Sequence, residues 1–296
     1  MRSVPVKQFF ESDISDPRFA RVVSSLRSRL LERLRAGALE LPLLPQVASQ
    51  VLALASNEDA DARELSDLLR KDPAMTAHVL RVVNSPFYRA RASIDSLEQA
   101  TRRLGHLKVR QIALVIACKQ RVFRARGFEP EVYKSFRHSL AAAFFAERIA
   151  RVRQVDQESA FVAGLLHDIG RPVLLQAVVD LDADARLADG PAVLAVVAEL
   201  HTLVGGMLAQ KWRLPPQIAG AIAYHHDPLS CPSSSPLPLI VSLADDLAVG
   251  ALEANDEPET ACGTHWTLPH LGIGAAAVEL LVAQRGVLLE SLQAVA

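Results

Sequence analysis

Apolar residues recur at helical spacing along almost the whole chain, and this pattern most constrains the fold. Within residues 19–36, for example, Leu26 and Leu30 belong to one apolar stripe, while arginines occupy the rest of the helix surface. No segment of consequence alternates polar and apolar residues with period two, the pattern of a half-buried strand. The sequence therefore predicts an all-α protein.

Turn and capping residues set the expected helix boundaries. Asp61 and Asp72-Pro73 are expected to begin helices, because aspartate can cap a helix N-terminus and proline is tolerated in the first turn. Asn84-Ser85-Pro86 is expected to end one, because the residue before proline is pushed out of the α region. Helices are expected at residues 19–36, 46–55, 62–71, 75–84, 96–104, 109–119, 133–152, 157–166, 171–179, 191–210, 215–224, 239–252 and 278–294.

The 296 residues suffice for one large domain or two modest ones. A glycine- and proline-containing stretch at 127–130 is the expected boundary between two helical lobes, residues 38–127 and 128–255. Residues 1–37 are expected to form an N-terminal helical extension, a candidate for oligomerisation or docking. Residues 256–296 are expected to form a C-terminal helical extension.

Composition excludes several classes of protein. The net charge of -1 provides no general attraction to nucleic acid or to acidic membranes. The uninterrupted apolar runs are shorter than the roughly 18 residues of a membrane-spanning helix, and residues 1–12 lack the apolar core of a signal peptide. Three widely spaced cysteines argue against a disulfide framework. A soluble cytoplasmic protein without membrane insertion is expected.

An adjacent histidine and aspartate, His167-Asp168, follow an apolar run and precede Gly170. Imidazole and carboxylate groups are ligands for first-row divalent metals, and such groups are costly to bury unless they are paired or metal-bound. Further candidates stand on other predicted helical segments, as a site inside a helical bundle requires. These candidates are His138, His201, His225, His226 and Asp245.

These residue types are suited to a reaction at a phosphate group. Asp168 can bind or bridge metal ions, and a metal-bound water can attack a phosphorus centre near neutral pH. Arg171 can hold a phosphate through its planar guanidinium. An ordinary ion pair at Arg171 stays open as the alternative.

In the order of its motifs, the chain resembles HDOD proteins, members of the HD superfamily of metal-dependent phosphohydrolases and relatives of HD-GYP domains. The resemblance covers about residues 38–255. It rests on Leu41-Pro42, Leu44-Pro45, Asp72-Pro73, Val83 to Tyr88, Ile94 to Ala100, Leu104-Gly105, Ala160 to Gly170, Glu199, His201, Val204-Gly205, Trp212, Leu214-Pro215 and Tyr224-His225-His226.

The resemblance implies two helical lobes, with an HD-type helical bundle as the C-terminal one. It also implies a bacterial signalling role, because HDOD modules accompany sensory and regulatory domains and generally lack demonstrated catalysis. Matched to the catalytic relatives, the metal-ligand set looks complete: His138, His167, Asp168, His201, His225, His226 and Asp245. The implied cofactor is one or more divalent ions, with iron, manganese, zinc and nickel as candidates.

Two departures from the catalytic relatives bear on activity. The Gly-Tyr-Pro signature of the enzymes that hydrolyse cyclic di-GMP is absent, because residues 227–232 read Asp-Pro-Leu-Ser-Cys-Pro. Arg171 stands where catalytic relatives often carry lysine, which keeps the charge but changes the geometry. Both departures count against cyclic di-GMP hydrolysis.

Three functional hypotheses follow. The first is a signal-transduction output or interaction module with an HD-like metal site, without efficient catalysis and with a signalling protein as partner. The second is a metal-dependent phosphohydrolase, acting on a nucleotide or another phosphorylated small molecule, that uses the seven candidate ligands with Asp168 and Arg171 as catalytic residues. The third, a nucleic-acid-linked regulator, rests on the basic stretch from Lys119 to Arg126 alone, which a solvated helix end explains more simply.

Overall fold

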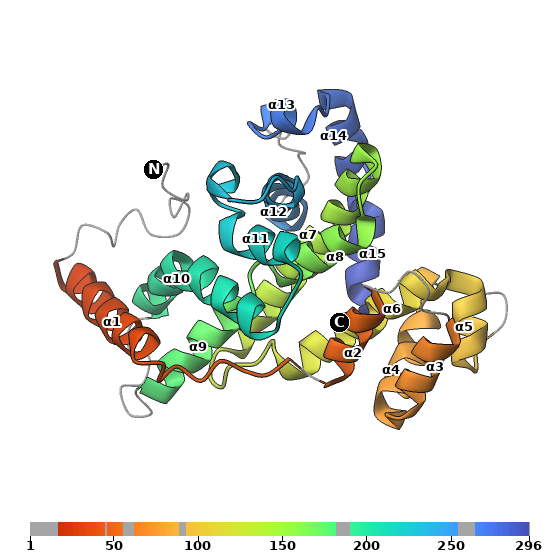
Figure 1. Ribbon diagram of the computed structural model, residues 1–296, viewed down its shortest axis with the longest axis horizontal. Helices are drawn as coiled ribbons and strands as arrows, with labels where there is room; N and C mark the ends of the chain where they lie inside the picture. Colours follow the sequence, from red (N-terminus) through yellow and green to blue (C-terminus); the bar gives the residue numbers. More distant parts are fainter. Residues whose placement is uncertain are drawn as a thin grey trace.

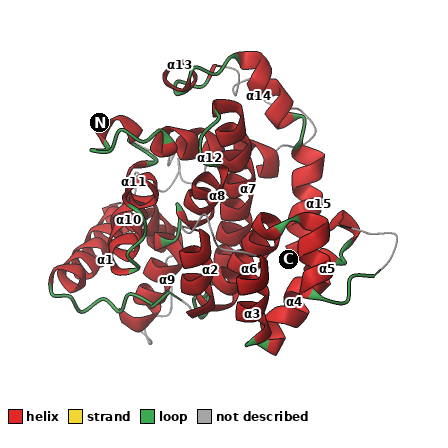
Figure 2. Cartoon of the chain, turned by 45° about the vertical axis from the view of Figure 1, so that its right-hand side comes forward, coloured by secondary structure: helices red, strands yellow, loops and turns green. Residues whose placement is uncertain are grey.

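The computed structural model describes residues 17–44, 46–55, 62–88, 93–181, 190–253 and 264–295. Over these ranges all regular secondary structure is helical, which confirms the predicted all-α class (Figures 1 and 2). The helices are α1 (Pro17–Arg35), α2 (Gln46–Ala55), α3 (Ala62–Arg70), α4 (Pro73–Val83), α5 (Leu97–Leu104), α6 (His106–Arg121), α7 (Glu129–Arg153), α8 (Gln157–Leu166), α9 (Gly170–Leu181), α10 (Gly190–Lys211), α11 (Pro216–Tyr224), α12 (Leu237–Glu253), α13 (Leu268–Leu271), α14 (Ala275–Val282) and α15 (Arg285–Val295). Two short 3-10 helices are η2 (Pro86–Tyr88) and η3 (Pro228–Ser230).

Helices α2 to α6 pack together on one side of the molecule, to the lower right in Figure 1. The Asp72 side chain accepts a hydrogen bond from the backbone N–H of Met75 at 3.0 Å, so the predicted cap of α4 is present. Asn84 ends α4 and pins the chain that follows, because its side-chain amide donates to the carbonyl of Ile94 and its oxygen accepts from the Ile94 N–H. The expected helix start at Asp61 lies outside the described residues.

The second group of helices is built around α7, which packs against α8 and α12. Gly164 of α8 permits this close packing, since a Cβ there would lie 2.8 Å from the Cα of Ala143 on α7. Helices α9, α10 and α11 follow, with α10 against both α9 and α11. Buried apolar residues of both groups form one continuous core, and α6 lies between them, in contact with α2, α4 and α8.

Helix α1 packs on α10 rather than on the helices that follow it in sequence (Figure 1). Leu30 and Leu34 are buried, and Arg27 forms an ion pair with Glu199 of α10 at 3.3 Å. The connection after α1 then runs past the end of α10, where the indole N–H of Trp212 donates to the Pro42 carbonyl at 2.9 Å. This contact brings together Leu41-Pro42 and Trp212, which lie 170 residues apart in sequence.

The C-terminal part corrects one prediction. Residues 278–294 do not form a single helix, because α14 ends at Val282 and α15 starts at Arg285. The side-chain oxygen of Gln284, in the break, accepts a hydrogen bond from Arg148 of α7. Helix α15 then returns to the first group of helices, where Lys119 of α6 donates to the Val295 carbonyl at 2.9 Å.

Two stretches, Gln157–Leu181 and Gly190–Lys211, are long and apolar enough to cross a membrane by length and composition. Polar residues interrupt both stretches, so neither contains an apolar run of that length. Inside the protein, however, 83% and 56% of their most apolar windows are buried. They are the core helices α8 to α10, which is consistent with a soluble protein.

Candidate metal centre

The structure brings all seven predicted ligands together in the second group of helices. They come from α7, from the turn after α8, from α10, from the end of α11 and from α12. His167, Asp168, His201 and His225 have side chains no more than 4% exposed, whereas His138, His226 and Asp245 are 14–26% exposed. The residues are His138, His167, Asp168, His201, His225, His226 and Asp245.

One half of the cluster is formed by His138, His167 and Asp245, with one ligand atom of each within 4.8 Å of the others. Nε2 of His138 lies 2.8 Å from Oδ1 of Asp245. Nε2 of His167 lies 3.7 Å from the same oxygen and 3.7 Å from Oδ2 of Asp168. His138 and Asp168 are 4.0 Å apart through Nε2 and Oδ2, well inside the roughly 10 Å beyond which no single ion could join them.

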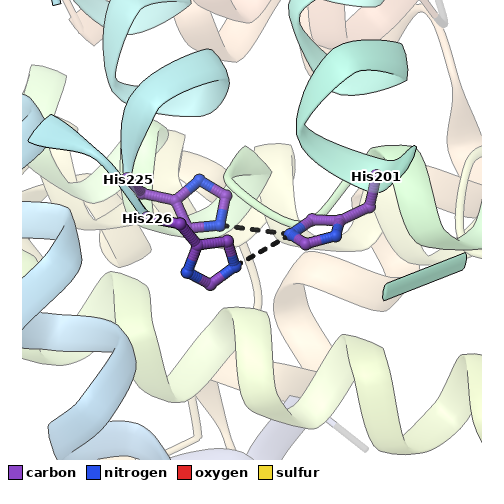
Figure 3. Close-up of side chains that lie close together, drawn as sticks. All are labelled: His201, His225 and His226. Carbon is purple, nitrogen blue, oxygen red and sulfur yellow. Dashed lines mark hydrogen bonds between the residues drawn. The ribbon is translucent and has the colours of Figure 1, made fainter. Parts of the chain in front are cut away.

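The other half contains His201, His225 and His226, whose rings point toward one another in Figure 3. Nε2 of His201 lies 3.4 Å from Nε2 of His225 and 3.1 Å from Nε2 of His226. Oδ1 of Asp168 is 3.2 Å from His201 Nε2, so the two oxygens of this carboxylate face the two halves. Such an arrangement suits a pair of ions bridged by one carboxylate.

Helix ends and a close helix crossing position these side chains. Helix α8 ends at Leu166, so His167 and Asp168 occupy the turn before α9 and project into the bundle. Gly170 begins α9 against α10, where a Cβ would lie 2.8 Å from the carbonyl carbon of His201 and 2.9 Å from the Gly205 nitrogen. Because Gly170 has no side chain, α9 can begin close to α10. The His-Asp turn therefore lies against His201.

Backbone carbonyls fix the orientation of three imidazoles. Nδ1 of His167 lies 2.8 Å from the Gly164 carbonyl, Nδ1 of His201 lies 2.8 Å from that of Ala198, and Nδ1 of His225 lies 3.0 Å from that of Ile222. A carbonyl oxygen only accepts, so each Nδ1 must donate its hydrogen. Nε2 of each ring consequently faces the centre of the cluster, which is the orientation of metal-binding histidines.

Two buried atoms lack the hydrogen bonds that burial ordinarily demands. Among the side chains that the structure describes, neither Nε2 of His167 nor Oδ1 of Asp168 makes a hydrogen bond. Buried polar atoms are almost always satisfied, by protein, by water or by an ion. A cation between the histidine nitrogens and the carboxylate oxygens satisfies both atoms, so the donor set fits a divalent metal.

Burial dominates the electrostatics of the second half of the cluster. Burial, followed by the nearby charge of Arg171, lowers the pKa of His201 to about 3. Burial also holds the pKa of His225 well below its ordinary value, followed by the effect of His226, whose own pKa is lowered by burial. The imidazoles are therefore neutral at physiological pH, which is the form that binds metal.

The carboxylates stay ionised despite their burial. Burial alone raises the pKa of Asp168, but Arg171 and His167 outweigh it and hold the value well below its usual range. For Asp245, the hydrogen bond from His138 and the proximity of His167 have the same effect. Burial lowers the pKa of His167, yet the two aspartates raise it to about 9. The first half of the cluster thus favours a positive charge at its centre.

Arg171 lies in the first turn of α9, with its side chain 32% exposed. Its Nε is 2.6 Å from Oδ2 of Asp168. Arg171 therefore forms an ion pair, which was the alternative to phosphate binding. Its partner, Asp168, belongs to the buried cluster and not to the surface.

Sequence reasoning missed the three carbonyls that orient the histidines. Each belongs to the residue three positions before its histidine: Gly164, Ala198 and Ile222. A usable signal exists for two of them, since His167 and His225 stand directly after helices, where carbonyls of the last turn lack helical partners. His201 lies inside α10 and gives no such signal.

Comparison with known proteins supports the family that the motifs indicate. The sequence profile of the HDOD domain matches residues 41–228, well over half of the chain. The chain belongs to the HDOD family. The matched region includes every predicted ligand except Asp245, which lies on the helix beyond it.

Two solved structures share the fold of this HDOD protein. An HDOD domain protein of Geobacter sulfurreducens is 25% identical, with a TM-score of 0.69 over 93% of this chain and 98% of the other. A protein of Shewanella amazonensis, provisionally named a phosphohydrolase, is 25% identical with a TM-score of 0.68 over 90% and 98% of the two chains. Their coverage extends beyond residues 41–228, into the terminal helices.

A curated relative, an uncharacterized protein of Treponema pallidum, is 24% identical over 199 residues. The match covers 64% of this HDOD chain but only 38% of the Treponema protein. The chain thus corresponds to well under half of that larger protein.

Proposed function

We propose that this HDOD protein is a signalling module that holds one or two divalent ions in its histidine-aspartate cluster and acts by binding a partner rather than by efficient catalysis. The observation that carries the proposal is the contact between Arg171 and Asp168 beside the buried cluster. The guanidinium that would hold a phosphate substrate is engaged by the site's own carboxylate. The missing Gly-Tyr-Pro signature at 227–232 supports the same conclusion.

Iron, manganese, zinc and nickel are the candidate ions, since imidazole nitrogens and carboxylate oxygens are common ligands for them. His138, His167 and Asp245 would hold one ion, His201, His225 and His226 a second, with Asp168 between them. A bound ion would supply Lewis acidity and a water molecule acidic enough to ionise near neutral pH. The contribution of the chain is to direct the Nε2 atoms inward and to bury four of the seven ligand side chains almost completely.

The cluster also supports a proposal about domain limits. Asp245 on α12 lies 2.8 Å from His138 on α7, so the HD-like lobe would be incomplete without α12. We therefore extend the HDOD domain to about residues 38–255, beyond the matched 41–228.

The binding partner of the proposed signalling module would be another signalling protein.

A metal-dependent phosphohydrolase is the second candidate, and one observation favours it. The more exposed members of the cluster, His138, His226, Asp245 and Arg171, leave part of the site open to solvent. Arg171 could then exchange Asp168 for a phosphate oxygen once a metal neutralises the carboxylate. A nucleotide or another phosphomonoester or diester would be the substrate.

The deciding experiment measures metal content and phosphate release on the same preparations. Protein purified without a histidine tag or chelator is analysed by elemental mass spectrometry and incubated with nucleotides, phosphomonoesters and cyclic dinucleotides. The proposal predicts near-stoichiometric metal, lost in His225→Ala and kept in the surface variant His106→Ala, with no release above background. Metal-dependent release that Asp168→Ala abolishes would establish the second candidate instead, and a folded protein that refuses metal would refute both.

A further inference from the structure

A concave site lies where the two groups of helices join, outside the histidine cluster. It is a pocket of about 450 Å³ formed by the end of α6, the connection to α7, the start of α7, and α9. The side chains that matter for the argument are Lys119, Phe123, Arg124, Arg126, Tyr133 and Gln176. The pocket contains most of the basic stretch from Lys119 to Arg126. Neither the helix packing nor the metal cluster gives this stretch a function.

The inner wall of the pocket is aromatic. Phe123 and Phe136 are buried and meet edge to face, with their ring centres 5.2 Å apart. Tyr133, one turn before Phe136 on α7, is 45% exposed and lines the pocket, and the Arg137 guanidinium lies 6.0 Å from the centre of its ring. Exposed aromatic rings on a rigid helix are suitable surfaces for stacking a flat heterocycle, because every base has a π-face.

The rim of the pocket is cationic. Arg124 and Arg126 are exposed, and within the described ranges neither guanidinium lies in an ion pair with a carboxylate. Lys119 places its ammonium 5.6 Å from the centre of the Phe136 ring. Glu129 is the one carboxylate among the lining residues, and it accepts a hydrogen bond from the Gly127 N–H at 3.0 Å.

We propose that this pocket binds a nucleotide, with the phosphates on Arg124 and Arg126 and the base against Tyr133. Planar guanidinium groups match phosphate oxygens in pairs. The volume falls within the range of about 300–1,000 Å³ that is typical of small-ligand sites. Gln176 of α9 also lines the pocket and holds the Arg126 backbone, because its side-chain oxygen accepts from the backbone N–H of Arg126 at 3.3 Å while its amide donates to Asp180 at 2.8 Å.

The pocket and the histidine cluster share two helices. Tyr133 precedes His138 by five residues on α7, and Gln176 follows Arg171 by five residues on α9. Five helical residues correspond to about 7.5 Å along the axis. A ligand held between Tyr133 and Gln176 therefore bridges the two helices that carry His138 and Arg171. Its binding can consequently shift the positions of these two side chains.

Isothermal titration calorimetry in EDTA tests the pocket independently of any metal. The probes are ATP, GTP and UTP, with adenosine and inorganic triphosphate as fragments. We expect the three nucleotides to bind and the double variant Arg124→Gln/Arg126→Gln to raise Kd at least tenfold. Tyr133→Leu should raise Kd about tenfold for ATP and leave triphosphate unaffected, whereas Glu129→Gln should lower Kd by removing a negative charge.

Matched variants locate the ligand. Arg81→Gln changes an exposed arginine on α4 and should leave Kd unchanged, and nucleotide binding should persist in Asp168→Ala, which places it outside the histidine cluster. Absence of nucleotide binding at millimolar concentration would refute the proposal, as would equal binding by the double variant or a loss in Asp168→Ala. Much tighter binding of a 12-nucleotide single strand, with the same arginine dependence, would overturn it in favour of a nucleic-acid surface.

Discussion

Replacing Gly170 with alanine tests the packing that holds the His-Asp turn. The added methyl group would meet the carbonyl of His201, with 2.8 Å to its carbon, and would lie 2.9 Å from the Gly205 nitrogen. Ordinary contacts of a Cβ are 3.4–4 Å. Because the obstructing atoms belong to the backbone of α10, no rotation of a side chain relieves the clash, and α9 and α10 must separate.

Overpacking of a tight core costs typically about 1–3 kcal/mol, and backbone obstacles place Gly170→Ala at the upper end, about 3 kcal/mol. For a domain of this size, that loss corresponds to a melting temperature lower by roughly 5–10 °C. Gly250→Ala is the matched control. Gly250 lies inside α12 with no atom within 4 Å of an added Cβ, so alanine should stabilise the helix there by about 0.5–1 kcal/mol.

Urea unfolding followed by circular dichroism measures both variants against the parent. Opposite signs for Gly170→Ala and Gly250→Ala are the expected result. A Gly170→Ala protein that is as stable as the parent would refute the close crossing of α9 and α10, and with it the explanation of how His201 is held against the His-Asp turn.

Three further changes probe other parts of the fold. Asp72→Ala removes the cap of α4 and should cost about 1 kcal/mol in the free energy of unfolding by urea, whereas no loss would contradict the cap. Trp212→Phe deletes the hydrogen bond to Pro42 and should cost about 0.5–1.5 kcal/mol, and a stability equal to that of the parent would show that this contact adds nothing. Burial raises the pKa of Cys118 to about 12, so iodoacetamide at pH 8 should leave Cys118 unmodified while the half-buried Cys231 reacts, as read by peptide mass spectrometry. Equal labelling of the two thiols would contradict the burial of α6.

Sequence patterns predicted the helices well where caps and breakers are local. Asp72 and Asn84 act through neighbouring backbone groups, so their effect could be inferred from the sequence alone. The break between α14 and α15 could not be inferred in this way, because residues 278–294 carry neither proline nor an obvious cap apart from Gly286. The tertiary contact of Gln284 with Arg148, 136 residues away in sequence, accompanies that break.

The composition of the candidate centre could be predicted from sequence, but its geometry could not. A motif order can nominate His138 and Asp245, yet only the packing of α7 against α12 sets their separation at 2.8 Å. The partner of Arg171 shows the same limit, since spacing alone allowed a phosphate or a surface carboxylate. Side-chain direction in the turn before α9 selects the buried Asp168 instead.

The position of α1 has a consequence for synthesis on the ribosome. Arg29 reaches the carbonyl of Leu181, 152 residues later in the chain, and the connection after α1 is fastened to residues near 211. Helix α10, on which α1 packs, ends at Lys211, so at a synthesis rate of about 5–20 residues per second it is complete roughly 9–35 s after α1. Helix α1 is thus placed late relative to its synthesis, and its apolar stripe stays uncovered throughout that interval.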